Sequence, residues 1–197
     1  PAAAAPLAKG HFRRIVTIER GRRIREARLV MTADNEFQCW VNGRNVGSGN
    51  NFSQAHALSV TRALRPGKNV LAVAATNTTD HPNPAGLIAA LTIRYDDGRT
   101  EDIVTDQAWE ATAAASGRWM TDATASRDWS AARVLGPFGM PPWGDVQTGL
   151  AASDPTPDIE SLRGVLTELQ VRPDFEAQTR NEPNALRFIH RAGDGTD

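Results

Sequence analysis

The sequence predicts an all-β fold in which two antiparallel sheets pack face to face. Short stretches of β character recur along the chain and are separated by turn signals, a spacing typical of β-sandwiches. Asn42-Gly43 is the strongest hairpin signal, because a type I′ turn needs positive φ at both central positions. Pro66-Gly67 suits the centre of a type II turn, whose second central residue also has positive φ.

The first half of the chain alternates apolar and polar residues, which places successive side chains on opposite faces of a strand. In residues 24–33, Ala27, Leu29 and Met31 fall on one side, and Arg28 falls on the other. The strands expected in this half are 11–18, 24–33, 36–41, 44–49 and 56–64.

The second half of the sandwich is predicted from four further stretches, which are 70–77, 85–95, 100–106 and 109–114. Residues 85–95 have a mixed apolar pattern, which predicts a strand that is covered on both faces. Residues 117–144 are rich in tryptophan, proline and glycine, and we expect them to wrap around the sandwich. Within them, "SRDWSAARV" predicts a helical turn that Ser126 or Asp128 caps.

Composition limits the classes of function. The chain has 197 residues, of which 40% are hydrophobic, so a packed core is expected and global disorder is not. A formal net charge of -1 gives no electrostatic basis for binding nucleic acid or an anionic membrane. No apolar run approaches the roughly 18 residues that span a bilayer. Seven arginines between Arg13 and Arg28 form either the solvated face of two strands or a patch for an acidic glycan.

Several kinds of catalytic and metal chemistry lack the residues that they need. The four histidines are not paired at zinc-ligand spacing, and the sequence contains no nucleophile elbow and no phosphate-binding loop. Cys39 is the only cysteine, and its apolar surroundings predict a buried thiol. Acidic residues that are close in sequence lie at expected turns, where they are usually solvated, so we assign no catalytic residue.

Loop amides and carboxylates favour a ligand with many hydroxyl groups. The candidate carbohydrate-binding residues are Asp34, Asn35, Asn77, His81 and Asn83 in loops, with Trp40 on a strand as an aromatic face. The other four tryptophans are alternative stacking platforms or core residues. Calcium is the candidate cofactor, because "TADNE", "TNTTDHPNP" and "DDG" supply the oxygen atoms that this ion prefers.

The order of these motifs resembles a known family. "FRRIVTI", "ARLVMTADNEFQCWVNGRNVGSG", "LRPGKNVLAVAATN", "AGLIAALTIRYDDG" and "IVTDQAWEAT" together look like the galactose-binding-like β-sandwich of bacterial glycoside hydrolases. The accessory sugar-binding domain of α-L-rhamnosidases and related β-galactosidase-type enzymes is the most similar. The resemblance covers roughly Phe12 to Gly144 and implies a jelly roll. Some members hold sugar and calcium in loops at one edge of the sandwich, and Asp34 and Asn35 match that loop.

We therefore expect three segments. Residues 1–10 are a linker or a processed N-terminus, residues 11–149 are the sandwich, and residues 150–197 are a linker and the start of a following module. That last segment is expected to be mostly irregular or partly helical, with helical spacing of apolar residues over 159–169.

The expected function is that of a non-catalytic carbohydrate-binding or accessory domain of a bacterial glycoside hydrolase. Its partners would be a polysaccharide that contains rhamnose or galactose, and a catalytic domain in the same or a longer chain. Two alternatives remain, a purely structural module that braces a catalytic domain and a part of the glycosidase itself. The Ala/Pro-rich start is compatible with signal cleavage, so we expect a secreted or periplasmic protein.

Overall fold

Strands make up all the regular structure of the part of the chain that the computed structural model describes. This part comprises residues 4–5, 8–78, 83–124, 128–140, 143–144, 146–148 and 187–190. The strands form two large sheets and one two-stranded sheet, and the predicted all-β sandwich is confirmed. No helix among these residues is long and apolar enough to cross a membrane.

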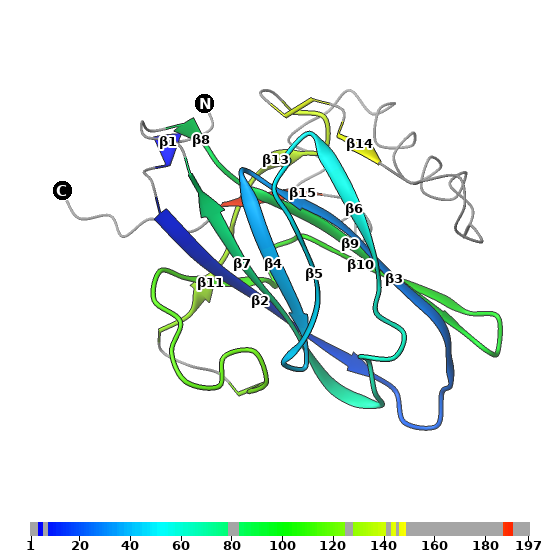
Figure 1. Cartoon of the computed structure of the whole chain (residues 1–197). Helices are drawn as coiled ribbons and strands as arrows, with labels where there is room; N and C mark the ends of the chain where they lie inside the picture. Colours follow the sequence, from blue (N-terminus) through cyan, green and yellow to red (C-terminus); the bar gives the residue numbers. More distant parts are fainter. Residues whose placement is uncertain are drawn as a thin grey trace.

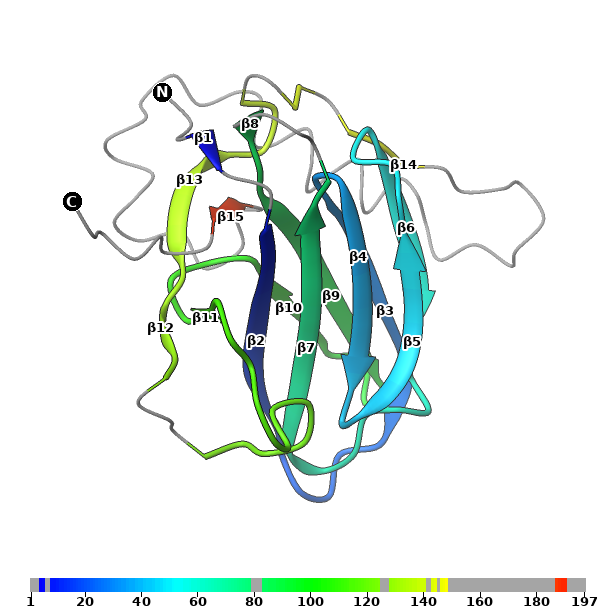
Figure 2. The ribbon, with the colours of Figure 1, turned by 60° about the vertical axis from the view of Figure 1, so that its left-hand side comes forward.

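The first layer is a six-stranded sheet in which every strand is antiparallel to its neighbours. In spatial order its strands are β12 (Ser130–Ala131), β11 (Glu110–Thr112), β2 (Ala8–Ile18), β7 (Gly67–Asn77), β4 (Glu36–Val41) and β5 (Arg44–Gly49). The pair β2–β7 is in register over all 11 residues of each strand. Figure 2 shows β2, β7, β4 and β5 side by side, with β9 and β3 behind them.

The second layer contains seven strands. Along its main path these are β13 (Arg133–Pro137), β15 (Arg187–His190), β9 (Leu87–Tyr95), β3 (Ile24–Ala33), β6 (Gln54–Ser59) and β14 (Gln147–Thr148), and β10 (Thr100–Val104) also pairs with β9. Only β14, which runs parallel to β6, departs from the antiparallel pattern. A small separate sheet joins β1 (Ala4–Ala5) to β8 (Asn83–Pro84), as Figure 1 shows.

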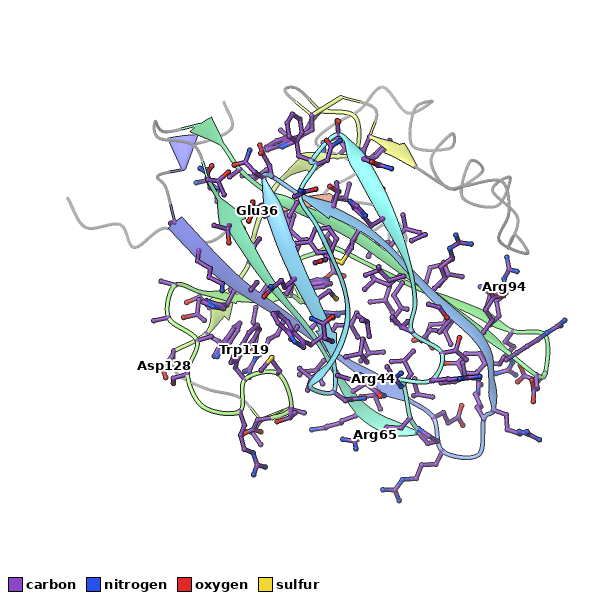
Figure 3. All side chains as sticks on the ribbon, in the orientation of Figure 1. Glu36, Arg44, Arg65, Arg94, Trp119 and Asp128 are labelled. Atoms are coloured by element: carbon purple, nitrogen blue, oxygen red, sulfur yellow. The ribbon has the colours of Figure 1, made fainter. Side chains whose placement is uncertain are left out.

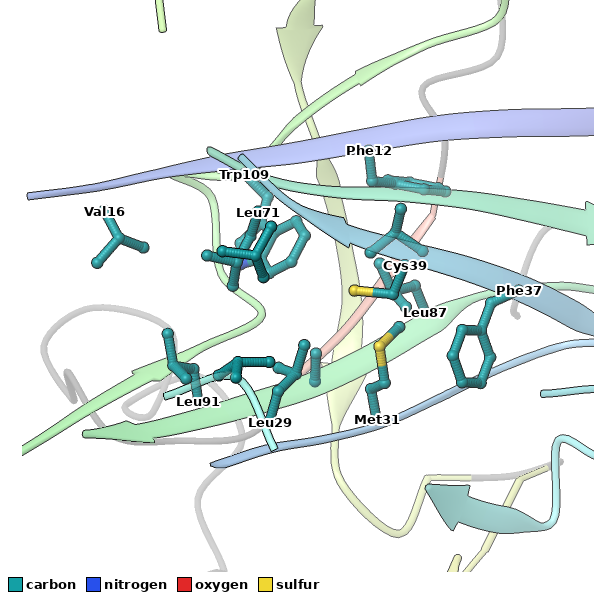
Figure 4. Close-up of a cluster of buried hydrophobic side chains, with 14 of the residues drawn as sticks. Phe12, Val16, Leu29, Met31, Phe37, Cys39, Leu71, Leu87, Leu91 and Trp109 are labelled. Atoms are coloured by element: carbon teal, nitrogen blue, oxygen red, sulfur yellow. The ribbon is translucent and has the colours of Figure 1, made fainter. Parts of the chain in front are cut away.

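The main core lies between the two layers, where the apolar faces of the alternating strands meet. Figure 4 shows Phe12, Cys39 and Leu71 of the first layer facing Leu29 and Met31 of the second. Trp109 completes this core. Its side chain is 1% exposed, and its indole N–H donates a 2.9 Å hydrogen bond to the carbonyl of Val104. This interlocking of two apolar faces is what the alternation in the sequence predicts.

Strand β9 is buried on both faces, as its mixed apolar pattern predicts. Leu91 points into the main core, whereas Ile88 and Ala90 belong to a second apolar cluster on the outer face of the same sheet. Trp143 and Val146, from the segment that follows β13, cover this second cluster. The expectation that residues 117–144 wrap around the sandwich is therefore confirmed for its last part.

Two turns have the conformations that the sequence predicts. Asn42 has a φ of 52° and Gly43 a φ of 80°, as a type I′ hairpin between β4 and β5 requires. Gly67 has a φ of 89° after Pro66, as expected at the second central position of a type II turn.

Strand β6 ends earlier than expected, at Ser59. The next residues turn tightly, and the N–H of Leu64 donates to the carbonyl of Val60 at 3.2 Å. The hydroxyl of Thr61 accepts a 2.8 Å hydrogen bond from the N–H of Ala27, a group that a longer β6 would have paired. The hydroxyl of Thr61 thus takes the place of a backbone carbonyl of β6 as the partner of Ala27. The apolar periodicity of the sequence does not reveal this exchange.

The helical turn expected over 126–134 is wrong for the residues that the structure describes. Ser130–Ala131 and Arg133–Pro137 are strands, and the N–H of Ala132 donates to the carbonyl of Trp109 at 2.8 Å. Pairing with strands of the sandwich outweighs the local helical preference of Ala131 and Ala132.

The C-terminal tail contributes a strand to the sandwich. β15, from the segment that we expected to begin a further module, pairs antiparallel with β13 and with β9. The helix expected over 159–169 lies outside the described residues, and the division of the chain at residue 149 remains a prediction.

Candidate functional site

The connection between β3 and β4 bridges the two layers of the sandwich. The N–H of Asp34 donates to the carbonyl of Gly86, just before β9, at 3.0 Å. The N–H of Asn35 donates to the carbonyl of Thr76 in β7, also at 3.0 Å, and the peptide bond between Asp34 and Asn35 is cis. Because β9 and β7 belong to different sheets, these bonds fix two polar residues at one end of the sandwich.

The carboxyl group of Asp34 is buried and incompletely satisfied. The residue is 7% exposed, and its Oδ1 atom has no hydrogen-bond partner among the described residues. Burial raises the pKa of Asp34 above its usual value, because the charged form is poorly solvated, and contact with the indole N–H of Trp143 acts in the opposite direction. The contact with Trp143 does not make a hydrogen bond of good geometry, and a buried acceptor in that state is energetically costly, so a ligand hydroxyl or a cation would stabilise it.

Asn35 lies beside Asp34 and is held by the end of β7. Its Oδ1 atom accepts a 2.8 Å hydrogen bond from the N–H of Thr78. This contact orients the carboxamide, and no hydrogen bond from its NH₂ group is found within the described part of the chain. The amide donors can therefore serve a ligand that binds next to Asp34.

An exposed aromatic ring is present at the same end of the sandwich. The hydroxyl of Thr32, two residues before Asp34, hydrogen-bonds the carbonyls of Asn51 at 3.1 Å and Phe52 at 3.3 Å. These bonds hold the β5–β6 connection against the end of β3. Phe52 is 38% exposed and is the one large hydrophobic side chain that is exposed among the described residues. Phe52 is not among the predicted binding residues, and its only signal in the sequence is an aromatic residue within the polar run "NNFS".

The structure brings some of the predicted site residues together and separates others. Asp34 and Asn35 lie at one end, with Asn77 buried nearby at the end of β7. Asn83 belongs to β8, and its side chain, like the whole of His81, lies outside what the structure describes. Trp40 is at the other end of β4, beside Trp119. Figure 3 shows this separation through Glu36, the first residue of β4, and Trp119. The binding roles of all six residues remain predictions.

The five tryptophans fall into two groups. Trp109 and Trp143 are buried, with exposures of 1% and 5%. Trp40, Trp119 and Trp129 are half-buried and contact one another on the outer face of the first layer. Trp109 and Trp143 are therefore core residues, whereas the other three tryptophans are partly accessible at the surface.

Four of the arginines between 13 and 28 are paired with acids. The pairs are Arg13 with Glu110, Arg14 with Asp106, Arg22 with Glu19 and Arg23 with Asp96. This mixture of charges favours the interpretation as ordinary strand faces over a patch for an acidic polymer. Within the described ranges, no three His, Cys, Asp or Glu residues are grouped as a metal site.

The two facing antiparallel sheets are those of a galactose-binding-like β-sandwich of the accessory type. The family described as alpha-L-rhamnosidase N-terminal domain matches residues 22–132, more than half of the chain. The chain belongs to this family.

Individual relatives agree with this assignment. An α-L-rhamnosidase of Streptomyces avermitilis is 30% identical over 162 residues, which are 78% of this chain and 15% of that protein. Its structure in complex with L-rhamnose has a TM-score of 0.67 and covers 75% of this chain and 15% of that one. The Pleurotus ostreatus lectin in complex with GalNAc is 33% identical, with a TM-score of 0.67 over 76% of this chain and 43% of the lectin. The chain thus spans a small part of the rhamnosidase that it matches.

Proposed function

We propose that this chain is a non-catalytic carbohydrate-binding domain that holds a sugar at the end of the sandwich formed by Asp34 and Asn35. The observation that carries this proposal is the buried Oδ1 atom of Asp34, which has no hydrogen-bond partner among the described residues. The similarity to a GalNAc-bound lectin and to a rhamnose-bound rhamnosidase supports a monosaccharide as the ligand.

The groups at this end of the sandwich complement a sugar ring. Ionised Asp34 accepts a hydrogen bond from a hydroxyl, and the NH₂ group of Asn35 donates one to a neighbouring oxygen. Phe52 offers an apolar surface for the C–H side of the ring. A small number of such contacts gives a dissociation constant in the millimolar to micromolar range, which corresponds to about 4 to 8 kcal/mol of binding free energy.

Calcium is part of the proposal, because the unsatisfied carboxylate oxygen of Asp34 is the type of ligand that this ion prefers. Asp34 and Asn35 would hold it. The remaining ligands would be backbone carbonyls, water or sugar hydroxyls, since no acidic cluster is found among the described residues. When bound, the ion would supply a positive charge that keeps the carboxylate ionised and orders sugar hydroxyls.

Calorimetric titration of the whole chain with L-rhamnose, D-galactose and GalNAc, in calcium and in EDTA, tests the proposal. We expect at least one sugar to bind, and we expect Asp34→Ala to abolish that binding. Asp97→Ala is the matched control, because Asp97 is an exposed carboxylate in the turn at the opposite end of β9. Absence of binding by all three sugars in both solutions would leave the structural-module alternative.

The alternative that the chain is itself a glycosidase is tested separately. Glycoside hydrolysis requires two carboxyl groups about 5 to 9.5 Å apart across one bond. We expect no hydrolysis of p-nitrophenyl α-L-rhamnopyranoside or p-nitrophenyl β-D-galactopyranoside by the chain. Turnover that Asp34→Ala removes would overturn the non-catalytic assignment.

A further inference from the structure

The outer face of the first layer has small side chains along its central strand, β7. Ala72 and Ala74 of β7 point outward, because their neighbours along the strand point into the main core. Arg13 and His11 of β2 flank them on one side, and Trp40 of β4 is paired with Ala72 on the other. Both alanines are buried, at 0% and 3% exposure, so other side chains cover them.

Aromatic rings contact one another on this face. Trp119 contacts His11 edge-on at 5.1 Å and Trp40 edge-on at 5.7 Å, measured between ring centroids. Its ring is nearly parallel to that of Trp129, at 6.0 Å and 28°. Trp119 and Trp129 belong to neither of the two buried apolar clusters, and both remain half-buried. Two roughly parallel indoles are thus presented at the surface.

Arg13 fixes the position of this aromatic group. Its Nε atom donates a 2.6 Å hydrogen bond to Glu110, and its terminal nitrogens donate to the carbonyls of Asp122 at 3.3 Å and Thr124 at 3.0 Å. Its guanidinium carbon lies 4.4 Å from the centre of the Trp129 ring. Since Arg13 is 2% exposed and already occupied, it is a positioning residue that holds the loop and the indole.

A pocket of about 100 Å³ opens beside these rings. Its wall includes Trp119 and Trp129, together with Arg118, Asp122 and Asp128. Figure 3 labels two of these residues, Trp119 and Asp128. Asp122 accepts hydrogen bonds from the N–H and hydroxyl of Thr124, and these bonds hold its pKa below the usual value. The wall therefore carries parts of two indole rings, one exposed arginine and two acidic side chains, with no excess of positive charge.

We propose that this pocket is a second carbohydrate subsite, which takes one neutral pyranose unit of a glycan. The C–H face of the sugar packs on the Trp119 and Trp129 indoles, and its hydroxyls reach Arg118 and Asp128. A charged sugar is disfavoured because the pocket holds both signs of charge. A protein partner is disfavoured because Phe52, at another end of the molecule, is the one exposed large hydrophobic among the described residues. The subsite is separate from Asp34, because Asp34 precedes β4 and Trp40, which contacts Trp119, lies near the other end of that strand.

The test is a titration of the ¹⁵N-labelled whole chain with methyl β-D-galactopyranoside and with methyl α-L-rhamnopyranoside. The indole N–H signals of Trp119 and Trp129 report on the pocket, and the backbone signal of Asn35 reports on the end at Asp34. We expect a saturable displacement of both indole signals by at least one glycoside. The double variant Arg118→Ala/Asp128→Ala should weaken this binding about tenfold or more, because charge-assisted hydrogen bonds are lost.

The variants separate this proposal from the proposed function. Arg118 and Asp128 are exposed, so the double variant should keep its fold, which an unchanged melting temperature would verify. Asp34→Ala should remove the response of Asn35 and leave the indole response intact. Unmoved indole signals with both glycosides would overturn the proposal, as would a displacement that survives the double variant or disappears with Asp34→Ala.

Discussion

The side-chain amide of Asn42 donates a 2.8 Å hydrogen bond to the side-chain oxygen of Asn69. Asn69 is fully buried, at 0% exposure, and its own NH₂ group donates to the carbonyls of Arg65 and Gly67. Asn42 also accepts from the N–H of Val70 at 3.0 Å. The two asparagines therefore add side-chain hydrogen bonds between the β4–β5 hairpin and the start of β7, where the β4–β7 ladder ends.

Asn69→Ala should lower the free energy of unfolding by roughly 3 kcal/mol. The substitution removes the buried side-chain amide that bonds to Asn42, Arg65 and Gly67, and each lost hydrogen bond costs about 1 kcal/mol. Urea denaturation measures the change. Asn45→Ala is the control, because Asn45 is exposed on β5 and its loss should stay within about 0.5 kcal/mol. Equal effects of the two substitutions would contradict the role of the asparagine pair.

Gly43→Ala should destabilise the protein more than Gly21→Ala. Both glycines have positive φ, 80° and 92°, so either substitution carries a conformational cost of about 1 to 2 kcal/mol. A Cβ atom on Gly43 would also lie 2.6 Å from Cγ2 of Thr121, whereas nothing lies within 4 Å of one on Gly21. We expect an additional loss of roughly 1 kcal/mol at Gly43.

A double-mutant cycle isolates this contact. Thr121→Ser removes the Cγ2 atom and keeps the hydroxyl that donates to the carbonyl of Arg118. In the Gly43→Ala background it should recover most of the additional loss in thermal unfolding, and in the Gly21→Ala background it should recover none. Recovery in neither background would show that the loop carrying Thr121 simply moves aside.

Asp34→Asn should increase stability at neutral pH. Because the pKa of Asp34 is raised in the folded protein, the folded state binds its proton more tightly than the unfolded state. The free energy of unfolding therefore falls as pH rises from about 3.8 through the raised pKa, and the asparagine variant lacks this fall. Thermal unfolding across this range should show the two proteins diverging as pH rises.

The same substitution should remove sugar binding, so stability and binding should change in opposite directions. Calorimetric titration of the variant at neutral pH measures the second effect. A variant that is less stable than the native protein at neutral pH would show that the Asp34 carboxylate is well satisfied within the fold.

Cys39 should resist alkylation in the folded protein. The side chain is 0% exposed, and burial raises the pKa of its thiol to about 12, so the reactive thiolate is scarce at mildly alkaline pH. Modification by iodoacetamide, followed by mass spectrometry, should occur only as fast as the protein opens, and rapidly in denaturant. Rapid alkylation without denaturant would place the thiol outside the core.

Much of the fold could be predicted because its causes are local. Alternation in residues 24–33 gave the correct faces of β3, and Asn42-Gly43 gave the correct hairpin. Errors arose where a distant group determined the outcome. The hydroxyl of Thr61 ends β6 by bonding to Ala27, and pairing with distant strands makes residues 130–131 and 133–137 extended instead of helical.

The candidate site was less predictable for the same reason. Loop composition identified Asp34 and Asn35, but the contact between Asp34 and Trp143 depends on how the last segment covers β9. Trp40 has a side chain that could stack on a sugar, but its position in β4 puts its ring in contact with Trp119 and far from Asp34. Phe52 lies at this end of the sandwich because the hydroxyl of Thr32 bonds to the backbone of its loop. None of these relationships has a periodic signal in the sequence.

The position of β15 sets a practical limit on shortening this protein. Arg187–His190 lies between β13 and β9, so deleting it exposes the unpaired backbone groups of two strand edges. A chain cut at residue 149, where composition alone would divide it, should self-associate, and light scattering would reveal aggregates that the 197-residue chain does not form. By pairing with β13 and β9, β15 thus keeps these strand edges from pairing with other copies of the protein.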